Sequence, residues 1–283
     1  MDFKRVYRFC RFLSLDIVLG VVSGSILACR ILNVNPPFSY KSLLPLAVWI
    51  LYLSDHIIDG IRQAKQKQVT RYQKYYNRRR SLLVLIIFLI LLSVIILVLS
   101  FDRITFKFGL IVGIIVLGYF IFQQLRFSGK ISVFPKEPAI AIIYTAGIWS
   151  VPLLISKDSF GLNLYIVLFS FALIVLMNVQ LYSILQAKED KAYGYPSLAG
   201  AIGINLVYAL NLAIGIIISL LNLFIILWPI NDEFRNAGII FLGMDVSLFI
   251  LSLLSRFSIS KELLGILADA TFFIPFTILL FQG

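Results

Sequence analysis

The sequence predicts an all-α membrane protein: a polytopic bundle of nine transmembrane helices that forms one domain over residues 1–283. Hydrophobic residues make up 60% of the chain and charged residues only 14%, and the mean hydropathy is +0.96. A typical soluble domain carries about 25% charged residues. The apolar residues are also gathered in runs of about 20, the length that an α-helix needs to cross a bilayer.

Short polar segments separate the apolar runs. Three of these breaks are Asn35-Pro36-Pro37, the Phe101-Asp102-Arg103 turn and Trp228-Pro229, which are typical turn and helix-ending sequences. The nine predicted spans cover residues 12–31, 42–61, 81–100, 104–123, 138–156, 162–185, 201–228, 237–255 and 262–281. Trp149 and Trp228 are expected near the outer ends of their spans, in an aromatic belt.

The formal net charge of +11 does not indicate a nucleic-acid partner, because the basic residues lie in short loops between apolar runs. With nine spans, 19 of the 25 Lys and Arg residues fall on one side and six on the other. The positive-inside rule then places the N-terminus and the long loops in the cytoplasm and the C-terminus outside. Cys10 and Cys29 give no disulfide framework and are expected to be free thiols.

Two acidic clusters are predicted at the same, cytoplasmic membrane face. Asp55 and Asp59 are four residues apart at the end of the second span, so they lie on one face of a helix. Just past the end of the sixth span comes Gln186-Ala187-Lys188-Glu189-Asp190. Carboxylate oxygens are suited to Mg²⁺ that bridges to phosphate oxygens, and neighbouring basic residues are suited to the phosphate itself. With an apolar bundle for a hydrocarbon tail, the pattern indicates a prenyl diphosphate as ligand.

The number of spans and the two acidic clusters resemble the UbiA superfamily of intramembrane prenyltransferases, in its divergent bacterial branch, over the whole chain. The first family motif is Asn-x-x-x-Asp-x-x-x-Asp, and its positions here are Leu51, Asp55 and Asp59. The second is Asp-x-x-x-Asp, followed by a Gly and a small hydroxyl residue, and its positions here are Gln186, Asp190, Gly194 and Ser197. Three of the four family aspartates are therefore present.

The resemblance implies a Mg²⁺-dependent transfer of a prenyl group from a prenyl diphosphate to an aromatic or other lipid-soluble acceptor. Asp55, Asp59 and Asp190 would bind Mg²⁺ and act in catalysis. It implies a site in a bacterial inner membrane, with membrane lipid around it. The residues expected to contact the diphosphate are Arg62, Arg71, Lys130, Lys136, Lys191 and Tyr193.

The two departures from the motifs, Leu51 and Gln186, keep a second hypothesis open: a non-catalytic UbiA-like subunit that binds lipid or assists assembly of a membrane complex. A transporter comes third, since the chain shows no internal repeat. Asp55 and Asp59 also have a plainer interpretation, in which they neutralise Arg62 and the basic loop that follows.

Three further positions carry structural alternatives. His56 is expected to be a packing residue rather than a base. Lys136-Glu137 is either a surface ion pair or a phosphate contact. Asp269, a lone acid within the last span, is expected to face the bundle and to pair with a polar group.

Overall fold

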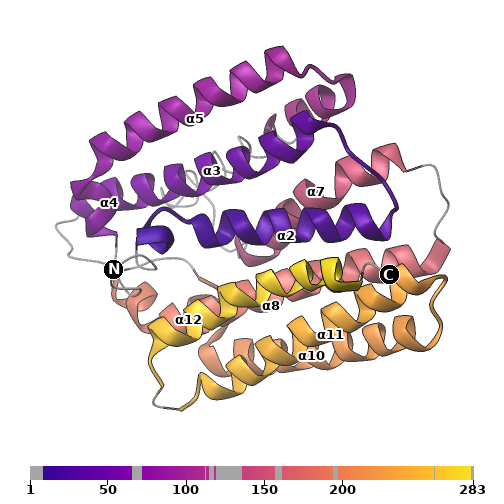
Figure 1. The fold of residues 1–283 in the computed structure, drawn as a ribbon. Helices are drawn as coiled ribbons and strands as arrows, with labels where there is room; N and C mark the ends of the chain where they lie inside the picture. Colours follow the sequence, from indigo (N-terminus) through magenta and orange to yellow (C-terminus); the bar gives the residue numbers. More distant parts are fainter. Residues whose placement is uncertain are drawn as a thin grey trace. The chain divides into compact units, whose positions relative to one another are not determined.

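The computed structural model describes residues 9–65, 72–111, 113–114, 118, 136–156, 161–193, 197–257 and 259–281, and these form helices joined by short connections (Figure 1). This confirms the all-α prediction for the described residues. Seven of their helices are long and apolar enough to cross a membrane, which indicates an integral membrane protein. Their spanning segments are Phe38–Ile61, Arg79–Leu99, Glu137–Ile155, Gly161–Ala192, Ile204–Leu227, Asp232–Leu254 and Lys261–Leu279.

The predicted count of nine spans stays a prediction. The first predicted span is the helix α2 (Leu15–Ile31), whose 17 residues are about 25 Å long, at the lower end of the range for a transmembrane helix. The fourth, 104–123, is described only in part: residues 103–111 are helical, and 119–123 lie outside the described residues. Asp102 caps the start of that helix, because its Oδ2 accepts the backbone N–H of Thr105 at 2.7 Å.

The contacts of the chain divide it into two compact units, one made of Met1–Val22 and Pro36–Phe106, the other of Ser23–Asn35 and Lys107–Gly283. In the first unit, α3 (Phe38–Lys65) packs against α4 (Gln73–Asn77) and α5 (Arg79–Leu99). The apolar core between α3 and α5 consists of Leu53, Ile57, Leu82, Ile86 and Leu89. The basic segment 62–80, expected as a loop, therefore begins inside α3 and contains a short helix.

The second unit is built on α8 (Gly161–Tyr193), which packs against α7 (Lys136–Ile155), α10 (Ile204–Leu227) and α11 (Asp232–Leu254) (Figure 1). The short helix α9 (Leu198–Ile202) precedes α10, and α12 (Lys261–Ala270) continues as the 3₁₀ helix η1 (Thr271–Phe281). η1 contains Pro275, which has no N–H for the α-helical hydrogen bond. Trp149 is buried in this unit against Phe171, so its expected place in an aromatic belt is wrong, whereas Trp228 is exposed.

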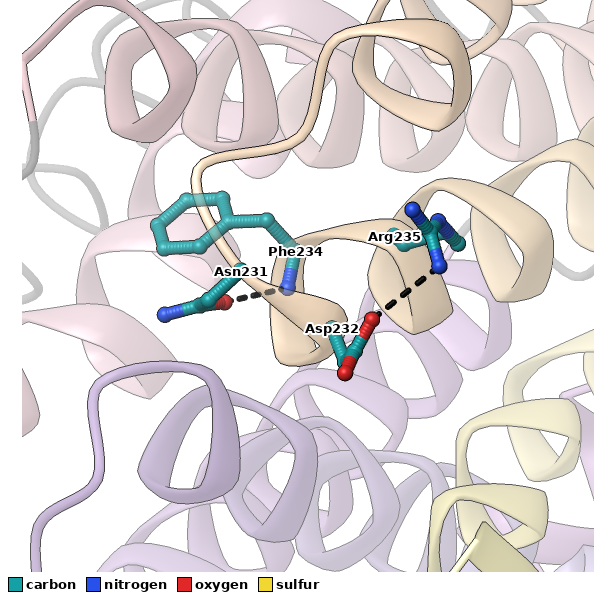
Figure 2. A network of polar contacts seen from close by, with 4 residues as sticks. All are labelled: Asn231, Asp232, Phe234 and Arg235. Atoms are coloured by element: carbon teal, nitrogen blue, oxygen red, sulfur yellow. Dashed lines mark hydrogen bonds and ion pairs between the residues drawn. The ribbon is translucent and has the colours of Figure 1, made fainter.

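Helix ends differ from the predicted spans where polar residues extend a helix beyond its apolar stretch. α11 begins five residues before the predicted span, because Asn231 caps it: its Oδ1 accepts the N–H of Phe234 at 3.0 Å (Figure 2). Asp232 and Arg235 form an ion pair of 3.0 Å on the first turn, and Glu233 pairs with Arg30 of α2 at 3.0 Å. The predicted span 201–228 is interrupted at Gly203, whose φ of +90° ends α9 before α10 begins.

Candidate functional site

Asp55 and Asp59 lie one turn apart in α3, as the sequence predicts, and both side chains are half-buried. Leu51, one turn earlier on the same face, is half-buried too. The two carboxylates project from one stripe of a membrane-spanning helix, toward its C-terminal end. Oxygen ligands on adjacent turns fit the chemistry of Mg²⁺, which binds one or two carboxylates and keeps waters or phosphate oxygens in its other positions.

His56, between the two aspartates, is packed among tyrosines. Its ring centroid is 4.6 Å from that of Tyr75, 5.7 Å from Tyr72 and 6.4 Å from Tyr52. Phe12 stacks on Tyr75, with the two ring centroids 4.8 Å apart. These contacts support the expectation that the histidine is a packing residue, and they show that Tyr72 and Tyr75 pack inward at the end of α3.

The phenol of Tyr75 keeps its proton in this cluster. Burial raises the pKa of Tyr75 well above its ordinary value, and the neighbouring Tyr72 and Asp16 act in the same direction, against a smaller opposing effect of Arg11. A phenol that stays neutral remains a hydrogen-bond donor beside the acidic end of α3.

Gly60, next to Asp59, lets α4 approach α3 backbone to backbone. A Cβ at Gly60 would lie 3.0 Å from the backbone N of Tyr76 and 3.1 Å from the backbone O of Tyr72. Only glycine gives this close approach without displacing a main chain. The segment from Tyr72 to Tyr76 therefore lies against α3 at Gly60, one residue after Asp59.

Asp190 lies inside α8, not past a helix end. The apolar stretch ends near residue 185, but α8 continues to Tyr193 because the polar residues that follow, such as Gln186, Lys188 and Glu189, are good helix formers. The Asp190 side chain is 6% exposed, whereas Lys188 and Glu189 are exposed. The two acids of this cluster therefore lie on different faces of α8: Asp190 faces the interior of its unit and Glu189 faces outward.

The inward face of α8 at this end is covered by α9. Ser183 and Ala187 lie two turns and one turn before Asp190 on that face. Ser183 Oγ accepts the N–H of Ala199 at 2.9 Å, and Ala187 packs with Leu198, Ala199 and Val207. Ser197, the small hydroxyl residue of the second motif, caps α9 by accepting the N–H of Gly200 at 3.2 Å.

Glu137 is a second inward carboxylate of this unit. It is 1% exposed, and its Oε1 accepts the N–H of Leu198 at 2.8 Å. The interpretation of Lys136-Glu137 as a surface ion pair is therefore wrong. Glu137 instead joins the start of α7 to the start of α9, so that α9 is held from two sides, by Glu137 and by Ser183.

Most of the residues expected to contact a diphosphate fall where the structure gives no side chain. Arg71 and Lys130 lie outside the described residues, as does Gly194. Arg62, Lys136 and Tyr193 are placed in α3, α7 and α8 by their backbone only, and their side chains are outside the description. Lys191 is described and exposed, one residue after Asp190. Asp55 and Asp59 belong to the first unit, and Asp190 and Lys191 to the second.

Asp269 has the polar partner that was expected. The Tyr182 hydroxyl lies 2.5 Å from Asp269 Oδ2 and 2.8 Å from the backbone O of Gly265. This hydroxyl of α8 therefore contacts α12 at two oxygen atoms. Two other acids, Glu137 and Asp245, are buried, which was not predicted from the sequence. The signal for Asp245 was available, because it is a lone acid within the predicted span 237–255. Glu137 had no such local signal.

Within the described residues, no three or more His, Cys, Asp or Glu side chains form a group that could hold a metal ion. Cys10 and Cys29 are not joined in a disulfide, as predicted. Comparison with protein-family models, with curated proteins and with solved structures found no match for this chain.

Proposed function

We propose that this protein is an integral membrane prenyltransferase of the UbiA type, which transfers a prenyl group from a prenyl diphosphate to an aromatic or other lipid-soluble acceptor. The observation that carries the proposal is the inward orientation of Asp190 beside an exposed Glu189, at the end of a membrane-spanning helix. A carboxylate that merely solvated a helix end would lie outward, because burying a charge is costly unless it is used.

Each carboxylate is assigned a role in holding the diphosphate. Asp55 and Asp59 present oxygens on adjacent turns of α3, and Asp190 presents oxygens from α8. Mg²⁺, when bound, supplies positive charge that holds the diphosphate and stabilises it as a leaving group. Lys191 and the other basic residues of the polar segments, Arg62, Arg71, Lys130 and Lys136, offer charge-assisted hydrogen bonds to phosphate oxygens, and Tyr193 a phenol.

In the reaction, the bond between the allylic carbon and the diphosphate oxygen breaks, and the electron pair leaves with pyrophosphate. The acceptor then forms a bond to that carbon and loses a proton. The apolar helices surround the hydrocarbon tail and keep water away from the allylic centre. The proposal also includes the positive-inside orientation, with the N-terminus in the cytoplasm of a bacterial cell and the C-terminus outside.

The test is pyrophosphate release by the purified full-length protein with Mg²⁺ and a panel of prenyl diphosphates, with and without a membrane lipid extract as source of acceptor. We expect release that depends on the chain length of one prenyl diphosphate and stops when Mg²⁺ is chelated. Asp55→Asn, Asp59→Asn and Asp190→Asn should each abolish turnover. Glu189→Gln is the matched control, since Glu189 is an exposed acid next to Asp190, and it should keep activity.

Turnover that survives all three Asp→Asn substitutions would rule the mechanism out. A second candidate function, a non-catalytic lipid-binding or assembly subunit of a membrane complex, is favoured by Leu51 and Gln186, where the family motifs have Asn and Asp. It predicts no pyrophosphate release by the wild type with any prenyl diphosphate. Pyrophosphate release that appears only in the double variant Leu51→Asn with Gln186→Asp would show that the substitutions at these two positions are what makes the wild-type protein inactive.

A further inference from the structure

A column of polar side chains, of which four are buried and Ser219 is half-buried, runs along the seam between α10 and α11, in a part of the second unit that the proposed function does not use. Ser219 Oγ donates to Asp245 Oδ2 at 2.6 Å, and Asn211 Nδ2 donates to Ser252 Oγ at 2.9 Å. Asn222 lies one turn beyond Ser219 on α10. Asn211, Asn222, Asp245 and Ser252 are each at most 1% exposed.

Two glycines bring the helices together at this column. A Cβ at Gly215 of α10 would lie 3.3 Å from Asp245 Oδ1, and a Cβ at Gly238 of α11 would lie 3.2 Å from the backbone O of Asn222. Each glycine thus faces a polar residue of the other helix. The Gly215 position is otherwise enclosed by Phe249 and Met177, whose side-chain atoms would lie 2.7 and 3.2 Å from the same Cβ. The carboxyl group of Asp245 is therefore in an apolar enclosure within a membrane-spanning helix pair.

The unpartnered atoms of the column are mostly hydrogen-bond acceptors. Asp245 Oδ1, Asn211 Oδ1 and Asn222 Oδ1 have no partner, and Asn222 Nδ2 is the single donor among them. A buried polar atom without a partner costs about 1–3 kcal/mol, and more when it is charged. An excess of acceptors around a carboxyl group is satisfied by a hydrogen-bond donor, by a proton on the carboxyl group or by a bound cation, and not by another acceptor.

The part of the chain that the structure describes places no cationic side chain on Asp245. Among the described residues, no Lys or Arg forms an ion pair with Asp245; the ion pairs that involve α11, Arg30–Glu233 and Arg235–Asp232, are at its first turn. Interhelical hydrogen bonds alone account for a serine or an asparagine in such a seam. They do not account for a carboxyl group, which in the low dielectric of a membrane marks an ion or proton site.

We propose that the α10–α11 seam binds an alkali-metal cation of the size of Na⁺, held by the carboxylate of Asp245 with Ser219 Oγ. The amide oxygens of Asn211 and Asn222 flank it on the two sides along the seam and complete its oxygen shell through water. One carboxylate and neutral oxygens balance a single positive charge, so we assign a monovalent and not a divalent cation to this seam. The site is independent of the prenyl-transfer proposal, and either can fail without the other.

The test measures the thermal unfolding of the full-length protein in detergent, with NaCl, KCl, LiCl or choline chloride at one ionic strength. A cation that binds only the folded state raises the melting temperature with its concentration. We expect a rise of about 3–5 °C with Na⁺ over choline when Na⁺ exceeds its dissociation constant about tenfold, and a further rise with the logarithm of the Na⁺ concentration above that. Equilibrium binding of ²²Na⁺ to the wild type measures the same event without unfolding.

Asp245→Asn is the decisive variant, because the amide keeps the shape and the bond from Ser219 but removes the negative charge. It should lose both the Na⁺-dependent rise and ²²Na⁺ binding. Asp232→Asn, in the exposed first turn of the same helix, is the matched control and should keep both. Ser219→Ala should weaken Na⁺ binding, whereas Ser247→Ala should not, since the Ser247 hydroxyl donates within α11 to Gly243 O at 2.8 Å.

Equal melting temperatures of the wild type in all four salts, together with no ²²Na⁺ binding, would overturn the proposal and leave Asp245 as a carboxyl group that holds only a proton. A Na⁺ response that is unchanged in Asp245→Asn would overturn it as well, because the cation would then bind elsewhere. If Asp245→Asn does not fold, the test is a comparison of ²²Na⁺ binding by Ser219→Ala and by Ser247→Ala. Equal binding by these two variants would overturn the proposed site.

Discussion

Glu137, in the first turn of α7, accepts through Oε1 the backbone N–H of Leu198 at 2.8 Å, across 61 residues of sequence. This one bond joins the helix that follows the second acidic cluster to a helix that precedes it. Glu137 and Leu198 are both buried, so the bond is made away from bulk water. The bond therefore fixes the start of α9.

The first prediction concerns this bond. Glu137→Ala leaves the buried N–H of Leu198 without a partner, which costs about 1–3 kcal/mol, and we expect the melting temperature in detergent to fall by several degrees. Glu137→Gln keeps an acceptor oxygen and should lie between Glu137→Ala and the wild type. Glu189→Ala, at an exposed acid, is the control. Equal melting temperatures for Glu137→Ala and Glu189→Ala would contradict the role of the bond.

The second prediction concerns the close contact of α3 with α4. Gly60→Ala places a methyl group 3.0 Å from the backbone N of Tyr76, so a main chain has to move, at a cost of about 1–3 kcal/mol. We expect a lower melting temperature and faster proteolysis of the segment around Tyr72. Gly109→Ala is the control, because a Cβ there meets nothing within 4 Å and the change favours the helix. An unchanged melting temperature in Gly60→Ala would show that the two helices separate freely.

The third prediction concerns the Tyr182 hydroxyl, which joins α8 to α12. Tyr182→Phe removes the bonds to Asp269 Oδ2 and Gly265 O and leaves a carboxyl group without that donor. We expect a loss of about 1–3 kcal/mol, seen as a lower melting temperature. Tyr165→Phe is the matched control, since Tyr165 is in the same helix and is 70% exposed. The idea is wrong if both substitutions have the same small effect.

The fourth prediction concerns the break between α9 and α10. Gly203 has φ +90° and ψ 146°, a backbone conformation that residues with a Cβ rarely adopt. A Cβ there meets nothing within 4 Å, so any effect of Gly203→Ala comes from backbone strain alone, about 1–3 kcal/mol. The measurement is the melting temperature of Gly203→Ala compared with that of Gly243→Ala, whose glycine lies within α11. A fall confined to Gly203→Ala is expected, and equal stability of the two variants would argue against strain.

Apolar run length predicts the helices well where a run is bounded by turns, as at α5 and α7, which lie within two residues of the predicted spans at each end. Apolar run length does not predict the helix ends where the terminal helical residues are polar. Residues 186–193 of α8 and 232–236 of α11 are helical although they lie outside the predicted apolar spans, because helix propensity and capping by Asn231 act without regard to hydropathy. The break at Gly203 falls inside an apolar run and depends on one φ angle.

The sequence alone determined the class of protein, the acidic pair on one face of α3 and the lone acid at Asp269, because hydrophobic composition and helical period are local properties. Only the tertiary structure decided which acids turn inward. Asp190 and Glu189 are neighbours of the same chemical type, yet one is 6% exposed and the other is exposed. Burial of Glu137 and Asp245 depends on helices that are distant in sequence, and no local pattern records which helix packs over a given side chain.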